Sequence, residues 1–184
     1  MKLIIVDMDG TLFDTKDVNF QAYRQALAEH GFDLNYEYYC SYCNGRHYSQ
    51  FLPQITTDNT QVLAAIHARK KELYKNFLDE ARPNRHLISI LRALRPEYKT
   101  ALVTTASHAN CYDILNCFQL TELFDLVLTH EDIIEAKPSP EGFLKAMNHF
   151  EANPEQTIIF EDSNVGLEAA KRSGAYYYQT FGFN

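Results

Sequence analysis

The sequence predicts an α/β protein whose core is a parallel sheet of five strands with helices on both faces. Short apolar runs rich in β-branched residues recur along the chain, and from residue 83 onward helical patterns separate them. Buried strands that alternate with helices are typical of parallel sheets, because a helix returns the chain to the start of each next strand. The 184 residues suffice for one such core with a small insert, but not for two large domains.

The predicted elements follow one another in a regular order. The strands are Leu3–Val6, Thr100–Val103, Leu126–Leu128, Thr157–Phe160 and Ala175–Thr180. Core helices are predicted where apolar residues recur at intervals of three and four, at 84–94, 108–118, 140–150 and 164–173. The strand and helix patterns alternate without interruption from residue 83 to the end.

One long stretch, between the first and second strands, has no strand-like run. Its apolar periodicity predicts helices at 17–30 and 60–80. We therefore expect a core made of residues 1–13 and 83–184, with a helical insert at 14–82. Tyrosine and phenylalanine are dense in the insert, and we interpret these rings as its buried core rather than as a recognition surface.

Charge and composition exclude several classes of protein. Seventeen basic against 24 acidic side chains give a net charge of −7, so we expect neither nucleic acid nor an anionic membrane as a partner. No run of 18 apolar residues occurs, and aspartates come too early in the chain for a signal peptide. We therefore expect a cytoplasmic protein with reduced cysteines, at Cys40, Cys43, Cys111 and Cys117.

Two carboxylates follow the first strand directly, where parallel sheets bind their ligands. Asp7 and Asp9 are costly to bury there unless a cation or a reaction uses them. A helix cap needs one carboxylate and leaves the second unexplained. A calcium loop counted from Asp7 fails, because Leu12 stands where that loop needs glycine and Val18 where it needs glutamate.

Further polar residues stand after the next three strands. They are Thr104 and Thr105, then Lys137 before two prolines, then Glu161 and Asp162. Each is ambiguous alone, since threonine is common at strand ends and a lysine before a helix is often a surface residue. Acidic pairs at two strand ends with a lysine between them predict a site for a divalent cation and an anion.

These motifs resemble the haloacid dehalogenase superfamily of aspartate-nucleophile phosphohydrolases, in the branch of β-phosphoglucomutase and phosphoglycolate phosphatase. The resemblance covers nearly the whole chain. It is carried by Asp7-x-Asp9-Gly10-Thr11, Thr104, Lys137 before Pro138, and Glu161-Asp162-Ser163-x-x-Gly166. It implies a Rossmann-like core with a small helical cap inserted after the first motif. In one departure the sequence stops at Asn184, where many relatives add a helix, which should remove no catalytic group.

The resemblance implies a Mg²⁺-dependent phosphatase of a small phosphorylated metabolite. Asp7 would attack phosphorus to give an aspartyl-phosphate, and Asp9 would protonate the leaving oxygen and then activate water. The implied metal ligands are Asp7, the Asp9 backbone carbonyl and Asp162, with Glu161 a ligand or an acceptor in the surrounding shell. The implied donors to the phosphoryl oxygens are Thr104, the Thr105 amide and Lys137.

Alternatives within and beyond this family stay open. The acid at Asp9 favours phosphoryl transfer over dehalogenation, because halide leaves without a proton. A phosphonate-cleaving lysine at Lys70 or Lys71 is less favoured than a solvated helix face. A mutase is disfavoured because Asn19 stands where β-phosphoglucomutase has a histidine on its first cap helix. A phosphate-binding protein without turnover is the third hypothesis.

The predicted cap contributes further candidates. The loop with Gly45, Arg46 and His47 resembles the family's substrate-contacting loop, although a surface arginine beside a turn glycine is equally compatible with it. Cys40-x-x-Cys43 with His47 lacks a fourth zinc ligand, so reduced thiols fit better. Phosphoglycolate, a sugar phosphate, a nucleotide and pyrophosphate stay open as substrates, and the protein is expected as a monomer or small homo-oligomer.

Overall fold

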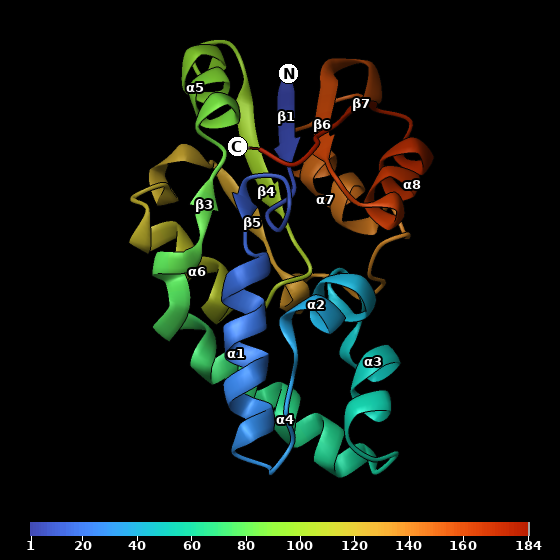
Figure 1. Ribbon diagram of the computed structural model, residues 1–184. Helices are drawn as coiled ribbons and strands as arrows, with labels where there is room; N and C mark the ends of the chain where they lie inside the picture. Colours follow the sequence, from blue (N-terminus) through green and yellow to red (C-terminus); the bar gives the residue numbers. More distant parts are fainter. Residues whose placement is uncertain (184) are drawn as a thin grey trace. The chain divides into compact units, whose positions relative to one another are not determined.

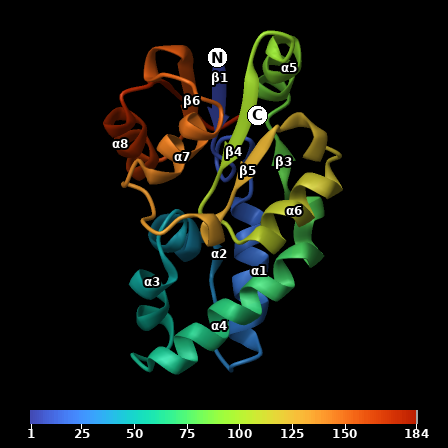
Figure 2. The ribbon, with the colours of Figure 1, turned by 180° about the vertical axis from the view of Figure 1, so that it is seen from behind.

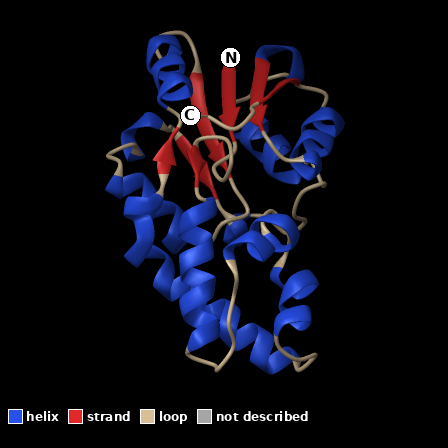
Figure 3. Cartoon of the chain, in the orientation of Figure 1, coloured by secondary structure: helices blue, strands red, loops and turns tan. Residues whose placement is uncertain are grey.

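The computed structural model describes residues 1–183, which form two compact units (Figure 1). The first unit consists of residues 1–14 together with the described chain from Arg82 onward, and the second is Thr15–Ala81. Figure 3 shows the strands gathered in the first unit, whereas the second is built of helices and loops.

A parallel sheet of five strands forms the centre of the first unit. Its strands are β1 (Leu3–Val6), β4 (Lys99–Val103), β5 (Leu126–Leu128), β6 (Thr157–Glu161) and β7 (Tyr176–Gln179). They lie in the order β5-β4-β1-β6-β7, and every neighbouring pair is parallel. The predicted fold class is therefore confirmed, and each strand lies within two residues of its predicted bounds.

The register of the central strand positions the site. All four residues of β1 are fully buried, as their β-branched and aliphatic side chains favour. Val6 is paired with Leu102 of β4 on one side and with Phe160 of β6 on the other. Because the strands are parallel and in step, the residues after Val6, Val103 and Phe160 emerge at the same edge of the sheet.

Helices cover both faces of this sheet. They are α5 (Arg85–Leu94), α6 (His108–Cys117), α7 (Glu141–His149) and α8 (Asn164–Ser173). Figure 2 shows α5 and α6 on one side and α7 and α8 on the other, as right-handed crossovers require for this strand order. Phe143 of α7 and Ala169 of α8 share a hydrophobic cluster with Ile5 and Ile159 of the sheet.

Short elements join these layers. A two-stranded antiparallel ribbon pairs β2 (Phe13–Asp14) with β3 (Arg82–Pro83), which the sequence analysis did not predict. Single turns of 3₁₀-helix occur at η3 (Thr121–Leu123), η4 (His130–Asp132) and η5 (Pro154–Gln156). Within residues 1–183, no helix combines the length and the apolar character needed to cross a membrane.

The second unit is helical throughout its regular structure. Its elements are α1 (Lys16–Ala28), α2 (Tyr36–Tyr38), the π-helical η1 (Tyr39–Cys43), α3 (Tyr48–Ile55), α4 (Thr60–Leu73) and the 3₁₀-helix η2 (Tyr74–Glu80). The predicted helix at 60–80 thus changes type after Leu73, and Phe77 has non-helical backbone angles. Phe20, Tyr23, Tyr39 and Phe51 lie in its buried cluster, whereas Tyr42 is exposed.

Candidate active site

A lysine joins two buried carboxylates at the edge of the sheet where the strands end. The Lys137 ammonium donates to Asp7 Oδ1 at 2.5 Å and to Glu161 Oε1 at 2.7 Å. Asp7 follows β1, Glu161 ends β6, and Lys137 lies on the connection between β5 and α7. All three side chains are at least nine-tenths buried. The fold therefore brings together three of the residues that the sequence predicted as a site.

Both oxygens of Glu161 have protein partners. Besides Lys137 at Oε1, Oε2 accepts the Ser163 N–H at 2.7 Å and the Ser163 hydroxyl at 3.1 Å. Gly166 makes room for this carboxylate, because a Cβ at that position would lie 1.7 Å from Oε1. The structure thus gives Glu161 the role of an acceptor for Lys137. In the sequence, Ser163 and Gly166 are recognisable only as parts of the motif that begins at Glu161.

Asp162 likewise has a hydroxyl donor and a glycine close to its carboxylate. The Thr11 hydroxyl donates to Asp162 Oδ1 at 3.0 Å. A Cβ on Gly10 would lie 2.1 Å from Asp162 Oδ2, and the φ of Gly10 is +86°, a conformation that favours glycine. The close approach to Asp162 is a second reason for glycine here, and it could not be seen in the sequence because 152 positions separate the two residues.

The site carries an excess of negative charge. Burial raises the pKa of Asp7 well above its usual range, with the charges of Glu161 and Asp162 adding to it and Lys137 opposing it. Burial and the Glu161 charge raise the pKa of Asp162 to about 6. Burial disfavours the charge on Lys137, but Asp7 and Glu161 outweigh it and raise the lysine pKa. Three acids facing one lysine make a second cation favourable.

The same three acids fit a divalent metal. Asp7, Glu161 and Asp162 each offer an oxygen, and these oxygens lie within 4.8 Å of one another. Among residues 1–183, no other group of three histidine, cysteine, aspartate or glutamate side chains has that geometry. An all-oxygen donor set is the one that Mg²⁺ prefers, usually with several waters retained. The acidic site therefore fits the predicted metal in charge and in donor type.

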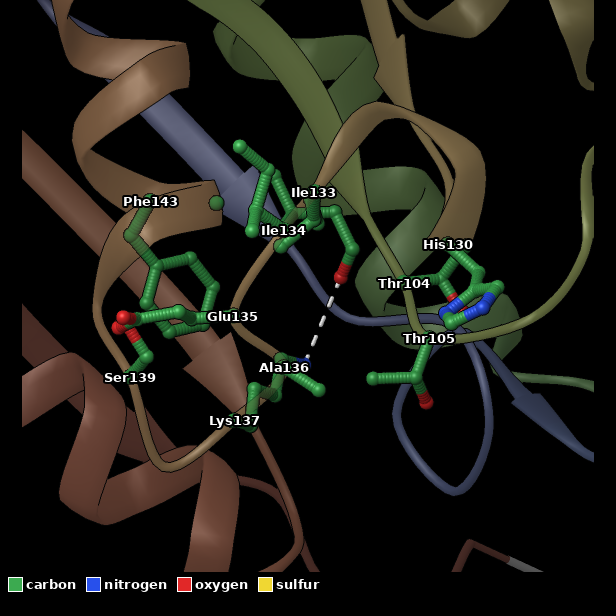
Figure 4. A pocket seen from close by; sticks show the side chains of 12 residues that line it. Thr104, Thr105, His130, Ile133, Ile134, Glu135, Ala136, Lys137, Ser139 and Phe143 are labelled. Atoms are coloured by element: carbon green, nitrogen blue, oxygen red, sulfur yellow. Dashed lines mark hydrogen bonds between the residues drawn. The ribbon is translucent and has the colours of Figure 1, made fainter.

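The predicted phosphate donors Thr104, Thr105 and Lys137 line one cavity. Thr104 is buried, and its Oγ1 accepts the Ala106 N–H at 3.0 Å, which leaves the hydroxyl proton to donate. Thr105, the next residue, is exposed at the start of the loop. Thr104, Thr105 and Lys137 all line a cavity of about 30 Å³, with the threonines on one side and the loop that carries Lys137 on the other (Figure 4).

Asp9 lies in the turn after β1. It is partly exposed and forms a bridge with Phe13. The nearby Cys111 thiol is buried, and its pKa rises to about 12 through that burial and through the negative charge of Asp9. Cys111 is therefore an inert thiol close to the predicted acid–base residue.

The predicted cap residues belong to the second unit. Asn19 of α1 donates to the carbonyl and the hydroxyl of Thr15, and its Oδ1 accepts the Lys70 ammonium at 2.5 Å. Gly45, Arg46 and His47 lie between η1 and α3, and Gly45 has a φ of +76°. All four cysteines are free thiols: Cys40 and Cys117 are exposed, and Cys43 and Cys111 are buried.

Fold and site together define a Rossmann-like α/β domain with an aspartate after its first strand and acidic residues at the end of a neighbouring one. The family model for haloacid dehalogenase-like hydrolases matches residues 4–179, so the chain belongs to this family. The resemblance noted in the motifs is thereby confirmed, and the protein is a hydrolase of this family.

Several relatives of this chain are phosphatases by name. A phosphorylated carbohydrates phosphatase of Thermotoga maritima is 28% identical over 95% of this chain and 82% of its own length. A fructose-1-phosphate phosphatase of Escherichia coli is 25% identical over 93% of this chain and 92% of its own length. The crystal structure of CbbY from Rhodobacter sphaeroides in complex with phosphate matches with a TM-score of 0.81 and 27% identity, over 100% of this chain and 87% of that one.

Proposed function

We propose that this protein is a Mg²⁺-dependent phosphatase that hydrolyses the phosphate monoester of a small metabolite through an aspartyl-phosphate. The observation that carries the proposal is the contact of Lys137 with Asp7 and Glu161 beside Asp162, at the carboxyl ends of parallel strands. Asp7 is the proposed nucleophile, and the lysine beside it stabilises both its carboxylate and an approaching phosphoryl group.

The chain's own residues divide the reaction between them. Asp9 is the proposed acid for the leaving alcohol and the base for water that releases phosphate from Asp7. Thr104, Thr105 and Lys137 are the proposed donors to the phosphoryl oxygens. When bound by Asp7, the Asp9 carbonyl and Asp162, with Glu161 beside them, Mg²⁺ supplies positive charge that offsets the charge developing on the phosphoryl group.

Two observations support hydrolysis of a small phosphorylated carbohydrate, and the second of them argues against a mutase. The relatives named above include phosphatases of phosphorylated carbohydrates and of fructose 1-phosphate. An amide at Asn19 cannot transfer protons, and its hydrogen bonds to Thr15 and Lys70 occupy it, which disfavours a mutase that uses a histidine there. Substrate contacts by Gly45, Arg46 and His47, and a cytoplasmic location, stay predictions.

The test is release of inorganic phosphate from a panel of esters with and without Mg²⁺. The panel contains p-nitrophenyl phosphate, several sugar phosphates, phosphoglycolate, a nucleoside monophosphate and pyrophosphate. We expect Mg²⁺-dependent release, strongest with a sugar phosphate, that falls to background in Asp7→Asn because the nucleophile is lost. The matched control is Asp113→Asn in α6, an aspartate that is not one of the three acids of the cluster. Equal release by Asp7→Asn and wild type would contradict the proposal.

A further inference from the structure

The loop that carries Lys137 has little packing of its own. Ile134 is 90% exposed, and Glu135 and Ala136 are exposed as well. Beneath this loop lies the cavity of about 30 Å³, which has room for one or two waters and is lined by the loop, Phe143 and the end of β4 (Figure 4). A segment with few buried apolar contacts is expected to move easily. The loop must therefore be held in place by other contacts if the Lys137 ammonium is to keep its short hydrogen bonds to Asp7 and Glu161.

That restraint comes from the first turn of α7. Glu141 Oε1 accepts the Ile134 N–H at 3.0 Å, and Oε2 accepts the Glu135 N–H at 2.6 Å. Lys145, one turn later, donates to Glu141 Oε1 at 2.8 Å and to the Asp132 carbonyl at 2.7 Å. One carboxylate thus binds two consecutive backbone amides, and the lysine that supports it also holds the chain just before them.

The charge of Glu141 is favoured by its surroundings. The Ile134 N–H, the Lys145 ammonium and the Glu135 N–H lower its pKa to about 2. The N-terminal turn of a helix also favours a negative side chain. On the far side of Lys137, the Arg172 guanidinium of α8 donates to the Pro138 carbonyl at 3.0 Å. The lysine is therefore held on both flanks by charged side chains from two helices.

We propose that Glu141 is a positioning residue for phosphate-ester hydrolysis, which holds the 134–135 backbone so that the Lys137 ammonium stays against Asp7 and the phosphoryl group. The inference rests on the role proposed above for Lys137. Glu141 itself binds amides and Lys145 and does not contact Asp7 or Glu161. Its effect on the reaction passes through Lys137.

The first experiment compares Glu141→Gln with Glu168→Gln, a matched loss of charge at an exposed position of α8. Glutamine keeps one acceptor oxygen and loses the other, together with the charge that attracts Lys145. We expect kcat to fall about tenfold in Glu141→Gln, with a smaller change in KM, because displacement of a charged group by a fraction of an ångström is costly in the transition state. Glu168→Gln should retain wild-type kcat.

Amide hydrogen exchange reports the restraint directly. The Ile134 and Glu135 amides should exchange faster in Glu141→Gln than in wild type, while those of β1 and β4 exchange as before. Unchanged exchange at Ile134 and Glu135 would overturn the proposal.

A double-mutant cycle separates positioning from general stability. In a Lys137→Gln background, Glu141→Gln should change kcat by less than twofold, because the group through which it acts is already gone. A tenfold loss that persists in that background, or a kcat in Glu141→Gln within twofold of wild type, would overturn the proposal.

Calorimetric measurement of inorganic phosphate binding in the presence of Mg²⁺ distinguishes failure of the Glu141 inference from failure of the proposed function. If wild type hydrolyses no ester, the proposed function fails and the positioning of Lys137 by Glu141 is judged on this binding together with the amide exchange. A dissociation constant at least threefold weaker in Glu141→Gln than in wild type then supports it, and an unchanged constant overturns it.

Discussion

The two compact units bury their polar groups in different ways. In the first unit, Lys137 lies between the carboxylates of Asp7 and Glu161. In the second, the Lys70 ammonium lies over the rings of Tyr23 and Tyr74, at 5.2 and 5.0 Å from their centroids, and contacts the Asn19 amide. The first environment places two carboxylates against one ammonium, and the second includes two aromatic rings and an amide among the contacts of the ammonium.

This difference indicates what each unit is built for. Paired buried charges stabilise a fold poorly, because desolvation offsets most of their attraction, so an acidic cluster with one lysine points to chemistry rather than to stability. The second unit instead has an aromatic core, in which Tyr23 meets Phe51 edge to face at 5.2 Å and Tyr48 stacks on His67 at 4.1 Å. Burial of such rings stabilises a unit without any metal.

The largest effect is expected at Gly166, which makes room for the Glu161 carboxylate. In Gly166→Ala, the added Cβ would overlap the Glu161 carboxylate, so this side chain and Lys137 must move. We expect kcat for phosphate release to fall by about a hundredfold, and Mg²⁺ binding measured by calorimetry to weaken. Gly182→Ala is the matched control, because among residues 1–183 no heavy atom beyond its chain neighbours lies within 4 Å of the added Cβ. Wild-type activity in Gly166→Ala would show that the charged site tolerates rearrangement.

A smaller effect, on stability alone, is expected from the aromatic cluster. Phe51 is 2% exposed, and Phe51→Ala should lower the free energy of unfolding by about 3–5 kcal/mol, measured by urea denaturation, through lost burial and a residual cavity. Tyr42→Ala, at a ring that is 53% exposed, should change it by about 0.5 kcal/mol or less. Mg²⁺ affinity of the folded Phe51→Ala protein should equal that of wild type. A weakened Mg²⁺ affinity in Phe51→Ala would contradict the assignment of metal binding to the first unit and of aromatic packing to the second.

The smallest effect is expected at a charged group outside the site. Asp125 accepts the Thr100 N–H and the Lys99 ammonium, each at 3.0 Å, and these bonds outweigh its partial burial and lower its pKa. A depressed folded-state pKa stabilises the protein above the unfolded pKa, near 4, and this contribution is lost as pH falls through the folded-state value.

Asp125→Asn should therefore reduce the free energy of unfolding by about 1 kcal/mol at pH 7. The difference from wild type should shrink below about pH 4, as followed by urea denaturation across pH. A difference that stays constant down to pH 2 would show that the charge of Asp125 plays no part.

Much of the fold was predictable because its signals are local. Apolar runs marked every strand of the sheet, with tyrosines in place of β-branched residues in β7, and the helices of the first unit lie within a few residues of their predicted bounds. The second unit was predicted less completely: α2, η1 and α3 carry no strong periodicity, since they are short and only some of their aromatic residues, such as Tyr39 and Phe51, are buried. The β2–β3 ribbon was missed because two-residue strands have no pattern of their own.

The sequence by itself determined which residues stand at the strand ends, because strand positions follow from local apolar patterns and parallel strands end at one edge. Only the tertiary structure decided their partners. Lys137 meets Asp7 across 130 positions and Glu161 across 24, contacts that depend on strand order and register. The same holds for Gly166 beneath Glu161 and for the Glu141 bonds to the Lys137 loop, because they arise where separate elements pack together.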